Sequence, residues 1–425
     1  MTATQVIERR EQFASGLRRP LGAVWPEVVS HEHAGRLEGW VGRVDISRAR
    51  PAPWPWLRTG GGDVFGPLPF ATDPRGRRAD VAVIEHNWLI GSMPGQGKTS
   101  AVRVLNSATA LDPTVEKWTH ELKGTGDLDP FEQICHRFVS GIDDEAIAYA
   151  AESLKLLRAE VMKRAARLKK LDRGLCPDKK ITREIANRRS LHLWPIECTI
   201  DECQNLFAHP KYGKQAGEDA IFIIKLGRAL GVFLILATQR PDKDSLPTGV
   251  SGNVSTRFCL KVAGQVENDM ILGTSAYKNG ARATTFRPKV DAGLGYLKGE
   301  ENVPRVVRTY YLNDADTERV AKRARALREA AGTLSGAALG EDGRPERRDV
   351  LTDVLEVFGD APAIHWDVLA GHLAGRFPER WAETTPDAVS AECRARGVPS
   401  VVVTVAGERG RGCRREAVET AGGQS

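Results

Sequence analysis

The stretch Asn87-Trp-Leu-Ile-Gly-Ser-Met-Pro-Gly-Gln-Gly-Lys-Thr-Ser100 decides the fold of this chain. A short apolar run at 88–90 meets a turn rich in glycine and proline, and a helix-like segment follows Gly97-Lys98-Thr99. Strand, loop and helix in this order are typical of a phosphate-binding loop, whose backbone N–H groups hold phosphate oxygens. The pattern GxxxxGK[ST] has a glycine where this chain has Ser92. The alternative interpretation is a glycine turn before an ordinary helix.

The loop predicts a binding site for ATP and Mg²⁺. We expect Lys98 to reach the β- and γ-phosphates and the Thr99 hydroxyl to bind Mg²⁺. The complete set of expected nucleotide-binding residues is Ser92, Met93, Pro94, Gly95, Gln96, Gly97, Lys98, Thr99 and Ser100.

Two carboxylates follow a second apolar, β-prone run at 193–200. At the carboxyl end of a parallel strand beside a phosphate loop, Asp201 is expected to hold Mg²⁺, directly or through water. Glu202 is expected to orient and activate the attacking water. An Asp-Glu pair after a strand is a weak signal alone, and the phosphate loop about a hundred residues earlier strengthens it. Glu197 is an unexpected charge inside this strand.

A polar amide, Gln239, follows the uninterrupted apolar run at 232–237, which has the character of a central strand in a parallel sheet. An amide at that strand end can sense the γ-phosphate or position water. The alternative is a residue that only shapes the turn.

Alternating strands and helices predict an α/β chain with a doubly wound, mostly parallel sheet. The expected strands lie at 81–84, 88–90, 115–122, 193–200, 232–237, 256–262, 292–297 and 306–312. The expected helices lie at about 143–171, 217–230 and 314–331. The middle helix contains Gly227-Arg228 near its end.

Four regions are expected along the chain. Residues 1–75 form a small β-rich or irregular cap, with a strand at 37–46, and residues 76–332 form the nucleotide-binding motor. Residues 333–345 have the composition of a flexible linker. Residues 346–425 carry three helices (350–358, 366–373 and 385–396), a strand at 401–405 and a basic glycine-rich hairpin. This order predicts a winged-helix unit that binds DNA. The alternative is a helical domain that docks on protein.

The composition bounds the class of protein. The chain has 425 residues, a net charge of +6 and seven scattered cysteines without a C-x-x-C pair. These features predict reduced thiols and permit a polyanionic partner. We find no apolar run long enough to span a membrane and no signal-peptide core, so we expect a cytoplasmic protein that reaches a membrane only through a partner.

The long helix at 143–171 ends in a basic run that continues to Arg189. It contains Lys163, Arg164, Arg167, Lys169, Lys170, Arg173, Lys179, Lys180, Arg183, Arg188 and Arg189. Such a run is usually a solvated face, and contact with phosphates is the alternative.

Residues 81–330 resemble the FtsK/SpoIIIE DNA-translocase ATPases of the HerA group, and most closely the FtsK-like transfer proteins of actinomycete conjugative and integrative elements. The motifs that carry the resemblance are 91–99, Glu121-Leu-Lys-Gly124, Thr199-Ile-Asp-Glu-Cys-Gln204, Leu236-Ala-Thr-Gln-Arg-Pro241 and Ser255-Thr-Arg-Phe258, with 264–270 and 273–280. The resemblance implies a RecA-like P-loop NTPase fold.

The resemblance also implies roles for single residues. Lys98, Thr99, Asp201, Glu202 and Gln239 fall on the family's phosphate, metal, water and sensor positions. Arg228 matches an arginine finger that completes the site of a neighbouring subunit, which implies a homo-hexameric ring. Arg257 is the rival for that role. The membrane-spanning N-terminus of the cell-division members is not seen in this sequence.

Three functions stay open at this point. The first is an ATP-dependent motor that moves double-stranded DNA in conjugative transfer or in chromosome or plasmid movement, with a membrane protein of a transfer apparatus as a further partner. The second is a protein-secretion ATPase of the same superfamily. The third is a non-enzymatic DNA-binding regulator gated by nucleotide.

Overall fold

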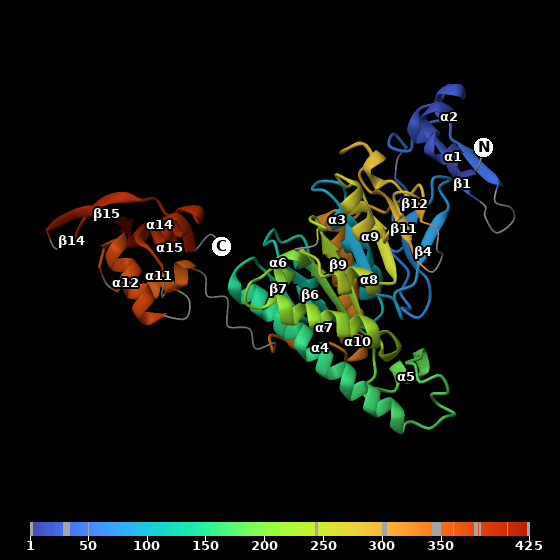
Figure 1. Ribbon diagram of the computed structural model, residues 1–425. Coiled ribbons are helices and arrows are strands. Elements are labelled where there is room, and N and C mark those ends of the chain that lie inside the picture. Colours follow the sequence, from blue (N-terminus) through green and yellow to red (C-terminus); the bar gives the residue numbers. More distant parts are fainter. Residues whose placement is uncertain are drawn as a thin grey trace. The chain divides into compact units, whose positions relative to one another are not determined.

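The computed structural model divides the chain into two compact units, residues 1–342 and 343–425, which we describe separately (Figure 1). It describes residues 3–28, 35–49, 51–242, 245–299, 304–341, 350–359, 361–377, 381, 384–405 and 407–422. Among these residues no helix is long and apolar enough to cross a membrane.

A ten-stranded sheet forms the centre of the first unit, in the order β4-β3-β12-β11-β10-β5-β9-β8-β6-β7. Its last six strands run parallel: β10 (Thr256–Cys259), β5 (Trp88–Gly91), β9 (Val232–Thr238), β8 (Ile196–Asp201), β6 (Glu116–Glu121) and β7 (Cys135–Ser140). Every residue of β9 is buried, as expected of a strand covered on both faces. The predicted α/β class with a mostly parallel sheet is confirmed.

Four antiparallel strands extend the sheet beyond β10. They are β11 (Leu294–Lys298), β12 (Arg305–Thr309), β3 (Leu68–Thr72) and β4 (Arg78–Val81). The sheet therefore includes β3, a segment that the sequence placed in the cap, and the expected boundary at 75 falls between two paired strands. A separate pair, β1 (Val24–Val28) and β2 (Leu37–Val41), lies nearer the N-terminus.

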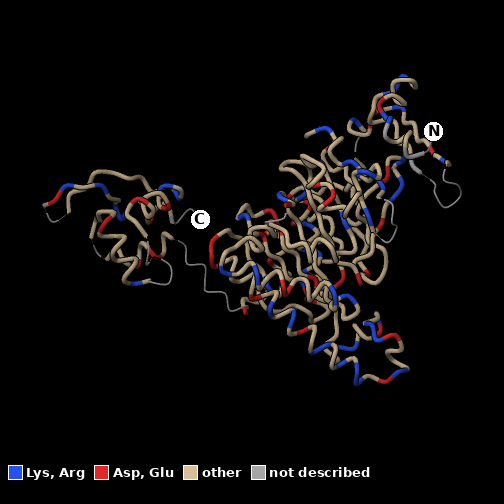
Figure 2. Tube along the Cα trace, viewed as in Figure 1, with Lys and Arg blue, Asp and Glu red and all other residues tan. Residues whose placement is uncertain are grey.

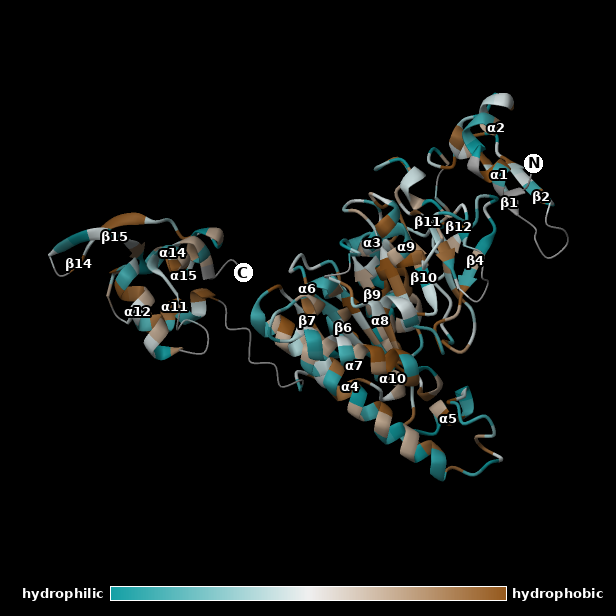
Figure 3. Ribbon diagram, viewed as in Figure 1, coloured by the Kyte–Doolittle hydropathy of each residue, from teal (hydrophilic) through white to brown (hydrophobic). Residues whose placement is uncertain are grey.

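Helices cover both faces of the sheet. On one face α4 (Asp144–Lys170) packs beside α7 (Gly213–Leu226), and on the other α3 (Lys98–Ala110) packs beside α10 (Asp314–Ala331). The alternation of β9 explains the two layers, because Leu234 and Leu236 join the first core and Phe233 and Ile235 the second. Helix α4 carries both hydrophilic and hydrophobic residues along its whole length, as an amphipathic helix does (Figure 3).

Polar caps fix where the long helices begin. The Asp143 carboxylate accepts a hydrogen bond from the N–H of Ala146 at 2.8 Å, and the Asn313 side chain accepts one from the N–H of Asp316 at 2.8 Å. The shorter helices of this unit are α1 (Ala3–Glu8), α2 (Arg10–Gly16), α5 (Arg183–Asn187), α6 (Cys203–Phe207), α8 (Thr248–Asn253) and α9 (Gln265–Leu272), with 3₁₀ turns between. The helix expected at 217–230 is α7, which ends at Leu226, and Arg228 lies in the 3₁₀ turn Arg228–Leu230.

The beginning of the expected linker is packed. Ser335 Oγ lies 3.0 Å from His136 Nδ1 on β7, and Gly336 is buried with the carbonyl of His136 against its α-carbon. Residues 342–345 of the expected linker lie outside the described residues.

The second unit has the winged-helix order. Its elements are α11 (Val350–Phe358), β13 (Ala363–His365), α12 (Trp366–Arg376), α14 (Pro386–Ala395), β14 (Val401–Val405), β15 (Glu408–Arg414) and α15 (Arg415–Gly422). The strands form an antiparallel sheet in the order β13-β15-β14 over one apolar core. The three expected helices, the expected strand and the hairpin are present, and β13 and α15 are additions.

Candidate nucleotide hydrolysis site

Four parallel strands end side by side at the carboxyl edge of the sheet. Gly91 at the end of β5 pairs with Thr238 of β9, Ala237 of β9 with Asp201 of β8, and Asp201 with Glu121 of β6. Every motif predicted to act on nucleotide follows one of these strand ends, so the topology brings them together at one edge.

The phosphate loop links β5 to α3 and depends on two glycines in the left-handed region. Gly95 has φ 73° and Gly97, the residue before α3, has φ 101°. A Cβ on Gly97 would lie 2.8 Å from the backbone nitrogen of Gly293, so only glycine fits. Ser92 has no positive φ and its N–H donates to the carbonyl of Thr238 at 3.2 Å. The missing first glycine therefore leaves the loop conformation intact.

Several of the expected loop residues hold the loop in place. The N–H of Met93 donates to the carbonyl of Lys261 at 2.7 Å, and the Ser100 hydroxyl donates to the carbonyl of Tyr310 at 3.1 Å. The Gln96 side chain and carbonyl accept hydrogen bonds from the N–H groups of Lys289 (3.2 Å) and Gly293 (2.9 Å). In the structure the Met93 N–H and the Ser100 hydroxyl thus brace the loop.

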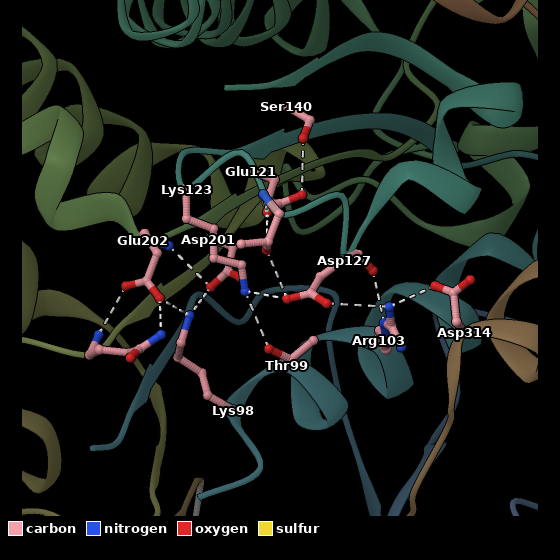
Figure 4. A network of polar contacts seen from close by, with 12 residues as sticks. Lys98, Thr99, Arg103, Glu121, Lys123, Asp127, Ser140, Asp201, Glu202 and Asp314 are labelled. Carbon is pink, nitrogen blue, oxygen red and sulfur yellow. Dashed lines mark hydrogen bonds and ion pairs between the residues drawn. The ribbon is translucent and has the colours of Figure 1, made fainter. Parts of the chain in front are cut away.

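Lys98, the first residue of α3, points at the two carboxylates that end β8 (Figure 4). Its ammonium group forms an ion pair with Asp201 and lies 2.8 Å from Glu202 Oε1. All three side chains are at most 5% exposed, so these charges interact with little screening by water. The structure brings together the lysine and both carboxylates that the sequence predicted.

Glu202 is held by amides from two directions. It has φ 56° at the start of α6, which turns its side chain back toward the loop residues. Gln204 Nε2 donates to Glu202 Oε2 at 2.6 Å, and Gln239 donates to Glu202 through its side chain and, at 3.2 Å, through its backbone N–H. The side chain of Gln239 therefore contacts the carboxylate that would activate water.

Lys123 is a site residue that was not predicted. Its ammonium group lies 3.2 Å from Asp201 Oδ2, 3.4 Å from Thr99 Oγ1 and 2.6 Å from Asp127 Oδ2 (Figure 4). It follows β6, at the same sheet edge as Asp201. The available signal was its place in 121–124, a motif at the end of a predicted strand.

The charged groups of the site shift one another's pKa values. Burial raises the pKa of Asp201, but Lys98 and Lys123 outweigh burial and hold that pKa below its ordinary value. Burial lowers the pKa of Lys123, and its carboxylate neighbours Asp201 and Asp127 reverse this, so the net shift is upward. Asp127 also contacts Arg103 of α3, whose NH2 lies 2.9 Å from Asp314 of α10. The site is therefore a network of compensated charges.

The residues present fit Mg²⁺. Thr99 Oγ1 and Asp201 Oδ2 both contact the ammonium group of Lys123. The two oxygens are therefore close enough to hold one cation between them. Hydroxyl and carboxylate oxygens are the ligands Mg²⁺ takes in phosphate-binding sites, together with substrate phosphates. Within the described part of the chain, no group of three or more His, Cys, Asp or Glu could hold a metal on its own.

The two candidate finger arginines differ sharply. Arg228 is exposed just before the first residue of β9, at the sheet edge opposite Gln239, and the length of β9 separates them by roughly 20 Å. Arg257 is buried in β10 and donates to the carbonyl of Ile271 at 2.9 Å. Burial lowers its pKa. Of the two, only Arg228 is exposed, and it lies at the sheet edge away from the site of its own chain.

No protein-family model matches the chain. Among curated proteins it is similar to DNA translocases named FtsK, including that of Haemophilus ducreyi, with 28% identity over 170 residues, 40% of this chain and 16% of the relative. The FtsK of Treponema pallidum matches with 25% identity over 256 residues, 58% of this chain and 30% of the relative. The chain thus spans less than a third of the length of these relatives.

The chain is similar to the FtsK/SpoIIIE ATPases. Among solved structures, the conjugation coupling protein TcpA of pCW3, in its monomer form with ATPγS, superposes with a TM-score of 0.56. It shares 18% identity, and the match covers 76% of this chain and 86% of that one. At this identity the likeness supports the fold, and the RecA-like assignment is confirmed. The predicted resemblance to FtsK-type translocases is confirmed as a similarity in sequence, and the predicted fold as a similarity in architecture.

Proposed function

We propose that this protein is an ATP-driven motor that moves double-stranded DNA during conjugative or related DNA transfer. The observation that carries the proposal is the convergence of Lys98, Thr99, Asp201, Glu202 and Gln239 at one sheet edge. The similarity to proteins named DNA translocase, and to a conjugation coupling protein in fold, favours DNA as the substrate.

The residues assign the chemistry of hydrolysis. The loop's N–H groups and the Lys98 ammonium group would bind the phosphates, and Lys98 offsets the negative charge that develops on the γ-phosphate. Glu202 would orient a water for in-line attack and take up its proton, while Gln239 fixes the carboxylate's direction through its hydrogen bonds. Bound Mg²⁺, held by Thr99 and Asp201, would neutralise phosphate charge.

We propose that Arg228 completes the site of a neighbouring copy. Its exposed position at the opposite sheet edge supports action in trans, since the length of β9 lies between it and the site of its own chain. An arginine that lies at one edge and serves the other edge of the next copy requires head-to-tail contacts, which give a ring when the rotation between copies closes. A ring of six follows the family, and attachment to a membrane protein stays a prediction.

We propose that the winged-helix unit binds DNA. A cleft runs between α14 and the hairpin strand β15, and its charged lining residues are Arg394, Arg409 and Arg411 with Asp367, Asp387 and Glu408. A helix beside a basic hairpin is the arrangement with which winged helices contact a groove and its phosphates. Competition between DNA fragments of different sequence for binding to the full chain measures how far this unit reads sequence.

A hydrolysis assay with and without linear duplex DNA tests the motor. We expect duplex DNA to stimulate ATP hydrolysis by the wild-type chain and Glu202→Gln to abolish it. Hydrolysis that is indifferent to duplex DNA would favour the protein-secretion alternative. Tight site-specific DNA binding without turnover would favour the nucleotide-gated regulator.

A further inference from the structure

Residues 162–192 form a basic projection that we name the basic arm. It consists of the end of α4, the following loop, α5 and the 3₁₀ turn Arg189–Leu191. Helix α4 runs past the sheet and leads to α5 beyond it (Figure 1). The arm holds eleven Lys and Arg against three Asp and Glu. Lys and Arg accordingly dominate this end of the unit in Figure 2.

The arm is an ordered part of the unit. Leu168, Cys176, Ile181 and Ile185 are buried in the core that also holds α7 and β8. The N–H of Ile181 donates to the carbonyl of Ala229 at 2.9 Å, which ties the arm to the 3₁₀ turn before β9. Its exposed cations are therefore presented from a fixed backbone, which lowers the entropy lost when they bind a partner.

Some cations of the arm serve its structure. Arg164 is buried and contacts Glu160 and the carbonyl of Leu230, so phosphate contact is wrong for this residue. The others with ion pairs are Arg167 with Glu160, Lys180 with Glu85, Arg183 with Asp63 and Asp112, and Arg188 with Glu184. These pairs fix the arm and leave the rest of its charge uncompensated.

Six exposed cations have no ion pair among the described residues. They are Lys163, Lys169, Lys170, Arg173, Lys179 and Arg189, the last with its guanidinium 5.3 Å from the Trp194 ring. None of the arm's three carboxylates forms an ion pair with these six cations among the described residues: Glu184 pairs with Arg188, and no ion pair is formed by Asp172 or Asp178. Exposed like charges gathered within one short part of the structure repel one another and attract a polyanion.

The arm's surface favours a phosphate backbone over a lipid bilayer. Helices that lie in a membrane interface pair their cations with an exposed apolar face. Among the large apolar side chains described in the arm, only Met162 is exposed, at 53%. We infer that the basic arm is a contact surface of the motor unit for the phosphates of duplex DNA. The inference rests on the proposed function in that DNA is the polyanion.

The position of the arm is compatible with turnover during DNA contact. The N–H of Ile181 donates to the carbonyl of Ala229, the residue after Arg228, and the arm directly precedes β8 in the chain. The arm therefore lies at the edge of the sheet where β8 and β9 begin, the amino edge. The nucleotide residues lie at the carboxyl edge. DNA held by the arm therefore leaves the phosphate loop of the same chain accessible.

Salt-dependent DNA binding by the full chain tests the inference, measured without ATP on a linear duplex of random sequence. The arm variant is Lys163→Gln, Lys169→Gln, Lys170→Gln and Arg173→Gln together. The control carries the same change in charge at Lys155, Lys214, Arg319 and Lys322, which lie outside the arm on α4, α7 and α10. A third variant, with arginine at 163, 169 and 170, keeps the charge.

The logarithm of the DNA-binding constant falls linearly with the logarithm of the salt concentration, and each phosphate contact that is lost makes this negative slope less steep by about 0.9. We expect the arm variant to lose about 2 to 3.6 from the slope and to bind at least tenfold more weakly near 0.1 M salt. The control and the arginine variant should bind as the wild type does. Equal slopes for wild type and arm variant would overturn the inference.

Two further measurements separate other partners of the arm. If the arm variant loses binding to vesicles containing phosphatidylserine while its DNA slope is unchanged, the arm is a membrane contact and the inference fails. If light scattering shows altered assembly with an unchanged slope, the arm is a subunit interface and the inference also fails. If the slopes of wild type and arm variant differ as expected but duplex DNA does not stimulate hydrolysis by the wild type, the proposed function fails and the inference about the arm stands.

Discussion

Lys117 of β6 and Glu197 of β8 form a fully buried ion pair, and its removal is a quantitative test of the packing beneath α3. Lys117 also donates to Asn106 Oδ1 at 3.1 Å and Thr109 Oγ1 at 2.8 Å, both on α3. Thr199 of β8 donates to Glu197 at 3.1 Å. The pair therefore fastens the helix that carries Lys98 to the strand that carries Asp201.

The size of the effect follows from burial. Burial lowers the pKa of Lys117, although Glu197 opposes the shift. Removing one partner leaves an uncompensated buried charge, which costs about 3–5 kcal/mol. We expect this cost for Lys117→Met and for Glu197→Leu. Additive effects would cost the double variant about 6–10 kcal/mol, but we expect it within about 2 kcal/mol of wild type, since replacing both charges removes both desolvation penalties.

Urea unfolding of the four chains measures this cycle. The coupling between the substitutions should be about 4–8 kcal/mol, the difference between additive and observed loss. Single variants that lose under 1 kcal/mol, or a double variant that loses their sum, would refute the reasoning. The double variant should also keep ATP binding, because Lys98 and Asp201 retain their own contacts.

Three other predictions follow from the site and its surroundings. Lys123→Met should lower the Mg²⁺ concentration needed for half-maximal binding of a fluorescent ATP analogue, because a cation 3.2 Å from Asp201 opposes metal binding; weaker binding would contradict this. Arg228→Ala and Glu202→Gln chains should each be inactive, and mixing them should restore hydrolysis, which a role of Arg228 within its own chain does not allow. Burial raises the pKa of Asp45, but hydrogen bonds from Arg287 and Ser47 outweigh it, so the net pKa is below its ordinary value of about 3.9. The stability this contributes is complete above pH 5 and is lost as pH falls below about 4, so the wild type's advantage over Arg287→Met in urea should shrink in that window.

The residues of the hydrolysis site could be predicted because each follows a strand, and parallel strands end at one edge. Lys98 lies about a hundred residues before Asp201 and Glu202 in sequence, yet only β9 stands between their strands, β5 and β8, in the sheet. The same reasoning placed Gln239. Their roles in hydrolysis stay predictions until activity is measured.

Other features depend on contacts that no local pattern carries. The partner of Glu197 is a lysine 80 residues away, so its charge looked misplaced in the strand. Lys123 gains its position from Thr99 and Asp201, and Arg164 is buried although the run around it is solvated. Strands β1, β3 and β7 were missed, and β4 ends at Val81, where the strand expected at 81–84 begins. Prolines mark the start of β3, and β7 carries only a short apolar run.

Displacement of a third strand from a linear DNA duplex tests the central claim most directly, because it reports movement along DNA and not hydrolysis alone. With ATP, the wild-type chain should displace a triplex-forming oligonucleotide, and Glu202→Gln should bind ATP and DNA without displacing it. Displacement by Glu202→Gln, or rapid hydrolysis by the wild type without any displacement, would contradict the account.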